Sequence, residues 1–162
     1  MSRRGRIGEK KTKYDPIFKN QLINRLAYHI MKNGKKSLAF KILYRVFLNI
    51  KKKTEKNPLY VLRQAIQKIT PDITVKIIRI GGFNKRIPLE VGYTQGQMLA
   101  IRWLLDASNK RTGKTMALRL SDELIDAAKN IGYAIRNKED IYEMVEENRE
   151  PDLNRRREDF QS

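Results

Sequence analysis

The sequence predicts a mainly α-helical fold: about six helices in a compact bundle, with one protruding two-stranded antiparallel β-ribbon between the third and fourth helices. Apolar side chains recur every three or four residues in six segments, the spacing that lines one side of a helix. Residues 73–91 instead alternate apolar and polar side chains around paired glycines, as a hairpin does. No repeat or low-complexity linker divides the chain. We therefore expect one helical domain at residues 15–148, between tails at 1–14 and 149–162.

The N-terminal tail, residues 1–14, is basic and contains few bulky apolar side chains. Because it can bury too little surface to offset the entropy lost on ordering, we expect it to be disordered until it orders along a phosphate backbone. A purely solubilising tail is the weaker alternative, since the cations are clustered. The tail residues expected to contact phosphate are Arg3, Arg4, Arg6, Lys10 and Lys11.

Three helices are predicted before the hairpin, at about residues 16–33, 37–52 and 58–69. The first and third begin with an N-cap residue followed by proline, at Asp15–Pro16 and Asn57–Pro58. Lysines at a helix C-terminus are explained by the helix dipole, but lysines in the turn between the first two helices are not. We expect these two turn residues to contact phosphate: Lys35 and Lys36.

A β-ribbon is predicted at about residues 72–92, and its paired glycines permit the positive φ of a tight turn. Because Pro88 removes a ladder donor and an isolated ribbon is marginally stable, we expect an arm anchored on the helical body. Its cations would face a polyanion. A charged edge that prevents aggregation would carry the same residues, so both interpretations stay open. The turn is expected at Gly81, Gly82 and Phe83, and the cations that would face the polyanion are Lys76, Arg79, Lys85 and Arg86.

Three more helices are predicted after the ribbon, at about residues 94–110, 115–131 and 134–147. In the first of them Trp103 lies beside the apolar stripe, so we expect it to pack against the core and not to stack on a base. A basic loop follows that helix. The candidate phosphate-binding residues of this part are Arg102, Lys110, Arg111, Lys114 and Arg119.

The charge of the chain is large and unevenly distributed. The formal net charge is +17. The first 121 residues carry 28 basic and 6 acidic side chains, a net +22, whereas the rest carries 7 and 12, a net −5. Such a field opposes compactness and favours a polyanionic partner, of which nucleic acid fits best. A membrane surface fits less well, because no long basic amphipathic helix with an aromatic face is present.

Several functional classes lack the residues that they need. There is no cysteine, and the single histidine, His29, has no evident partner, so we expect no disulfide, metal site or histidine-based catalysis. No apolar run reaches the length of about 18 residues that spans a membrane, and the N-terminus lacks a secretory signal. Residues 108–115, SNKRTGKT, approach a P-loop but lack its first glycine and its preceding strand. We expect neither an enzyme, nor a cofactor, nor a homo-oligomer.

Six short motifs follow one another along the chain: IGG at 80–82, IPLEV at 87–91, LAIRW at 99–103, MALRL at 116–120, EL at 123–124 and DAA at 126–128. With SRR at 2–4, DP at 15–16 and GKKS at 34–37, this set resembles the universal small-subunit ribosomal protein seven family in its bacterial type, over about residues 1–148. TEKNPL at 54–59, VLRQAI at 61–66 and TQG at 94–96 are similar to the plastid, or chloroplast, branch in particular.

The resemblance implies a structural constituent of the small ribosomal subunit. In such a protein the helical domain at residues 15–148 would bind rRNA through the cations named above, and the tail at residues 1–14 would order on RNA. It implies primary binding to the 3′ major domain of 16S-type rRNA, which nucleates assembly of the subunit head, with the ribbon near the exit-site tRNA and the mRNA path. The implied partners are the neighbouring head proteins and platform protein eleven. The implied location is the plastid stroma or, otherwise, the bacterial cytoplasm.

The chain departs from the family pattern at two places. Residues 83–86 make the ribbon tip more basic than is usual, and residues 149–162 replace an aromatic, basic ending. The residues by themselves also leave a different class of function open. This is an architectural duplex-DNA-binding protein with a basic β-arm, in which Phe83 would be the apolar wedge.

Overall fold

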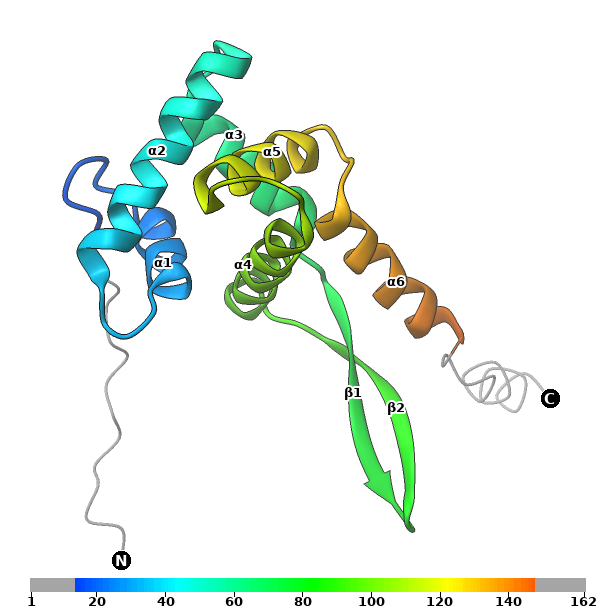
Figure 1. Ribbon diagram of the computed structural model, residues 1–162. Coiled ribbons are helices and arrows are strands. Elements are labelled where there is room, and N and C mark those ends of the chain that lie inside the picture. The colour runs from blue at the N-terminus through cyan, green and yellow to red at the C-terminus, as the bar shows by residue number, and fades with distance from the viewer. Residues whose placement is uncertain (1–13, 148–162) are drawn as a thin grey trace, which may run out of the picture.

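The computed structural model describes residues 14–147. Within this range it contains six helices and one two-stranded antiparallel sheet between the third and fourth helices, which confirms the predicted fold class (Figure 1). The helices are α1 (Gln21–Ile30), α2 (Lys36–Thr54), α3 (Pro58–Ile69), α4 (Tyr93–Lys110), α5 (Met116–Ala128) and α6 (Tyr133–Glu147). The strands are β1 (Ile73–Ile80) and β2 (Phe83–Glu90). None of the described helices is both long and apolar enough to cross a membrane.

Helix α5 lies at the centre of the helical body, where it packs against α2, α3 and α4 (Figure 1). The apolar stripes of these helices meet in one core, and each large side chain buried there contributes roughly 1.5–3 kcal/mol of transfer free energy. Its largest fully buried members include Leu43, Ile50, Leu62, Ile66, Ile101, Leu104, Leu120 and Leu124. The body is therefore a rigid support for the loops and the ribbon.

The start of the first helix differs from the prediction. Asp15 does not cap it, because a separate turn comes first and Lys19 has a left-handed φ of 48°. Helix α1 begins at Gln21 instead, where the side chain of Asn20 accepts a hydrogen bond from the Leu22 nitrogen at 2.9 Å. The buried Asp15 carboxylate accepts from the nitrogens of that preceding turn and from Tyr44 on α2.

The turn that connects the two strands of the ribbon is shorter than predicted. Only Gly81 and Gly82 lie between the strands, with φ of 57° and 89°, the positive values that a two-residue hairpin turn requires. Phe83, expected in the turn, is the first residue of β2 and is paired with Ile80. Consequently the basic residues at 84–86 belong to a strand and not to a loop.

The register of the ribbon places its two apolar sets on opposite faces. Ile77 is paired with Arg86 and Lys76 with Ile87, and paired residues share a face of the sheet. Each face therefore mixes apolar and cationic side chains. Near the body, α6 lies beside β1, and the Asp72 nitrogen donates to the Tyr142 hydroxyl at 3.3 Å. Beyond that contact the ribbon extends away from the helices (Figure 1).

Candidate nucleic-acid interface

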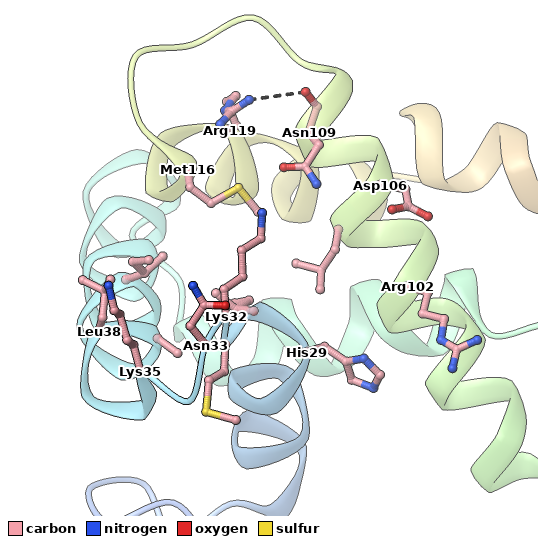
Figure 2. A pocket seen from close by; sticks show the side chains of 15 residues that line it. His29, Lys32, Asn33, Lys35, Leu38, Arg102, Asp106, Asn109, Met116 and Arg119 are labelled. Carbon is pink, nitrogen blue, oxygen red and sulfur yellow. Dashed lines mark hydrogen bonds between the residues drawn. The ribbon is translucent and has the colours of Figure 1, made fainter.

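A pocket of about 610 Å³ lies between the α1–α2 turn, the C-terminal half of α4 and the start of α5. Figure 2 shows Lys32 projecting from the turn toward Met116 at the start of α5, and Asn109 projecting from α4 into the same space. We call the four cations that line it the pocket set. Its members are Lys32, Lys35, Arg102 and Arg119.

The α1–α2 turn presents its two predicted lysines differently. Asn33 and Gly34 have positive φ, which reverses the chain and leaves both lysines exposed. Lys35 lines the pocket. The Lys36 ammonium lies 5.2 Å from the Tyr28 ring centre and 5.6 Å from that of Phe40, within the range of cation–π attraction.

Arg102 is exposed on α4, on the side of the helix that the core leaves free. It faces His29 at the end of α1 across the pocket (Figure 2). Burial and then the positive charge of Arg102 hold the pKa of His29 below its ordinary value of 6.5. His29 is therefore a neutral imidazole at neutral pH, with one donor and one acceptor nitrogen.

The predicted cations in and beside the loop after α4 have different surroundings. Lys110 and Lys114 are exposed. The guanidinium of Arg111, by contrast, donates to the carboxylates of Glu123 and Asp126 on α5, so it fixes the loop to the body. Its charge is thus paired with two carboxylates within the protein.

Arg119 on α5 is held at the top of the pocket. Its Nη1 donates to the Asn109 carbonyl oxygen at 3.3 Å. Gly113 allows this placement, because a Cβ there would lie only 2.8 Å from Cγ of Arg119. Because Gly113 has no side chain, the loop leaves room for the Arg119 side chain at this place.

The second group of predicted cations lies on the ribbon. Lys76, Arg79 and Arg86 are exposed, and we call them the ribbon set. Arg79 and Arg86 share one face, and Lys76 is on the other. Lys85 is paired with Ile78 in the same sheet. Arg3, Arg4, Arg6, Lys10 and Lys11 lie outside the described residues.

Two separate cationic groups on one helical body, one around a pocket and one on an arm, suit an extended polyanion. A family model described as ribosomal protein S7p/S5e matches residues 2–149. The chain belongs to the ribosomal protein S7p/S5e family. Members of this family are structural proteins of the small ribosomal subunit that bind its rRNA, and they are not enzymes. The described residues contain no cluster of three or more side chains that could hold a metal.

In this S7p/S5e protein the structure confirms the prediction for Trp103, and it adds pocket residues that the sequence did not indicate. Trp103 is partly buried and packs against the core, as predicted. Lys32, Asn33, Asp106 and Asn109 line the pocket but were not predicted. Only their proximity in sequence to Lys35 and to the basic loop at 110–114 could have suggested them.

Proposed function

We propose that this S7p/S5e protein is the primary binder of the 3′ major domain of small-subunit rRNA and that it nucleates assembly of the subunit head. The observation that carries the proposal is the division of exposed cations between the pocket set on the body and the ribbon set on the arm. Two such groups can grip two separate RNA elements at once. This is what a protein needs in order to fix the relative position of helices early in assembly.

The ribbon supports a location near the exit-site tRNA and the mRNA path. Each of its faces carries at least one exposed cation, so it can pass between two phosphate backbones. The basic residues of the N-terminal tail would add further phosphate contacts.

Helix α6 supports a protein neighbour, for which platform protein eleven is the candidate that the family resemblance implies. Its exposed residues include Glu139, Asp140, Glu143, Glu146 and Glu147. This acidic surface would repel RNA and suits a basic protein. The plastid-like segments favour a plastid ribosome, with a bacterial ribosome as the other setting.

A competition experiment at increasing salt tests the proposal. The full chain would be titrated against a folded 3′-domain rRNA fragment, scrambled RNA of equal length and random-sequence duplex DNA. We expect binding to the rRNA fragment to persist at salt concentrations that abolish the other two. The slope of log K against log salt then reports the phosphates engaged, at roughly 0.7–0.9 per phosphate. If duplex DNA binds as tightly as the fragment, the ribosomal proposal fails and a DNA-binding arm takes its place.

A further inference from the structure

The outer surface of α2 carries cations that the helical body leaves exposed. At roughly 3.6 residues per turn, the buried residues of α2 occupy one side of the helix, and a second set of residues occupies the opposite side. All members of this second set are exposed, including two leucines, at 52% and 59%. We call it the α2 stripe, and its members are Leu38, Lys41, Arg45, Leu48 and Lys52.

The charge of α2 has a single sign. The helix contains six cations and no acidic residue. Exposed helices that are stable in water commonly mix both signs, so that their charges pair along the surface. Lys41 and Arg45, four residues apart, repel each other instead, and within residues 14–147 neither side chain makes a hydrogen bond or an ion pair. An anion from outside the body would remove this repulsion.

The helix dipole accounts only for the end of α2. It favours cations in the last turn, where three lysines lie, and its effect fades within that turn. One of these, Lys53, is also paired with Asp122 on α5. Lys41 and Arg45 lie well before the last turn, so the dipole does not explain their positions.

The α2 stripe continues the cationic surface of the pocket. Leu38, its first member, lines the pocket together with Lys35 of the pocket set. From there α2 runs along the body to an end that lies far from the tip of the ribbon (Figure 1). An RNA that is bound at the pocket and extends along α2 would therefore meet the stripe next.

The form of the stripe suits a double-helical RNA. With a rise of about 1.5 Å per residue, Arg45 and Lys52 are roughly 10 Å apart along the helix axis, and Leu48 lies between them. The minor groove of an A-form helix is wide and shallow, and it displays ribose 2′-hydroxyls between two phosphate strands. An α-helix that lies across this groove can place a cation at each strand and an apolar side chain against the riboses. An acidic protein could also neutralise the cations, but the continuity with the pocket set favours RNA.

We propose that the α2 stripe binds the minor groove of a double-helical segment of the rRNA, in addition to the segments held by the pocket set and the ribbon set. Its three cations contact phosphates, and Leu48 packs against riboses. The inference rests on the proposed rRNA-binding function and adds a third contact surface to it. Because the like charges of the stripe repel one another in the free protein, their removal should weaken the complex without weakening the fold.

A double substitution on the stripe tests this combination of effects. We expect Lys41→Gln with Arg45→Gln to weaken binding of the full chain to the 3′-domain fragment and to reduce the salt slope by up to about 2. The urea midpoint of the free protein should not fall, because glutamine suits a helix about as well as lysine and arginine do. Arg63→Gln with Lys129→Gln is the matched control, since both positions are exposed and lie outside α2, the pocket and the ribbon. Equal losses of affinity in the two variants, or a lower midpoint in the stripe variant, would overturn the proposal.

The absence of cysteine from the chain allows the RNA near the stripe to be mapped directly. Leu48→Cys, at an exposed position, would carry a tethered iron–EDTA group whose hydroxyl radicals cut the nearby RNA backbone. Gln67→Cys on the exposed side of α3 is the control. We expect Leu48→Cys to cut both strands of a paired segment that the control does not cut. Cuts confined to unpaired nucleotides, or cuts no stronger than those of the control, would contradict duplex binding at the stripe.

Failure of the inference can be told apart from failure of the proposed function. If the unsubstituted chain prefers the fragment over scrambled RNA but the stripe variant binds like the control, only the third surface is wrong, and an acidic protein becomes the candidate partner of α2. If the unsubstituted chain shows no such preference, the proposed function fails and the inference fails with it.

Discussion

The buried carboxylate of Glu123 on α5 accepts a hydrogen bond from the backbone nitrogen of Ala134 on α6, with Oε1 at 2.9 Å from that nitrogen. Its other oxygen accepts from Nε of Arg111 in the loop after α4. One fully buried side chain thus joins the basic loop to the start of the acidic helix. Gly132 leaves room for it, because a Cβ there would lie 2.9 Å from Oε1.

Removal of this carboxylate should destabilise the body. We expect Glu123→Ala to lower the free energy of unfolding by about 3–5 kcal/mol, because it leaves Arg111 with one carboxylate fewer and the Ala134 nitrogen without an acceptor. Urea unfolding followed by circular dichroism measures this. Glu143→Ala on the exposed side of α6 is the control and should change the value by less than about 0.5 kcal/mol. Equal values for the two variants would show that Glu123 is not a structural link.

The hydrogen bond from Tyr44 to Asp15, at 3.0 Å, should make stability depend on pH in the alkaline range. Burial, followed by the hydrogen bond to Asp15 and the charge of Asp15, raises the pKa of Tyr44 to about 12. The folded state holds the phenolic proton more tightly than the unfolded state, whose value is about 10. The stabilisation is therefore complete below about pH 10 and is lost as the pH rises toward about 12.

Tyr44→Phe checks this dependence. The difference in unfolding free energy between the unsubstituted chain and Tyr44→Phe should be constant at neutral pH and shrink between about pH 10 and 12. Urea unfolding across this range measures it, and Tyr60→Phe at an exposed position is the control. A difference that does not change with pH would contradict the pKa shift.

Gly96 should not tolerate a side chain, because Thr70 and Pro71, which precede the ribbon, lie against it. A Cβ at this buried position on α4 would lie 2.8 Å from the Pro71 oxygen and 3.0 Å from Cγ2 of Thr70. Backbone cannot move aside cheaply, so we expect Gly96→Ala to cost roughly 1–3 kcal/mol of stability. Thermal or urea unfolding gives the value. Gly92→Ala, which meets no atom within 4 Å, is the matched control, and an equally small effect at both sites would rule out the steric explanation.

The ribbon set should contribute to RNA affinity without contributing to folding. Replacing Arg79 and Arg86, both exposed on one face, with alanine should weaken binding to the 3′-domain fragment and reduce the salt slope by up to about 2. The helical circular dichroism signal should not change. Lys56→Ala with Lys129→Ala removes the same charge from exposed positions outside the ribbon. Equal losses in the two double variants would show that only net charge matters.

The effect of Arg102 on the pKa of His29 can be measured directly, because His29 is the only histidine of the chain. Burial and the charge of Arg102 lower the pKa of His29. Arg102→Glu should therefore raise this pKa, since an anion favours the imidazolium. An NMR titration of the single imidazole measures the change, and Arg136→Glu, outside the pocket, is the control. The same substitution should weaken RNA binding, and an unaltered affinity at every salt concentration would remove Arg102 from the interface.

Much of the fold and part of the site could be predicted from local pattern. Helical spacing of apolar residues located all six described helices within a few residues, because each helix must turn one stripe to the core. The prediction that Trp103 packs held for the same reason. The prediction that Asp15 caps the first helix was wrong. An aspartate followed by proline can begin either a helix or a single turn, and here it begins a turn.

By itself, the sequence determined the fold class, the polyanionic partner and the family, since these depend on periodicity, summed charge and ordered motifs. The tertiary structure decided which cations remain available. Arg111 and Lys35 look equivalent in sequence, but Glu123 and Asp126 engage the first while the second lines a pocket. Partners in an ion pair or a pocket come from segments far apart in the chain, so only the packing of the helices determines which charges meet.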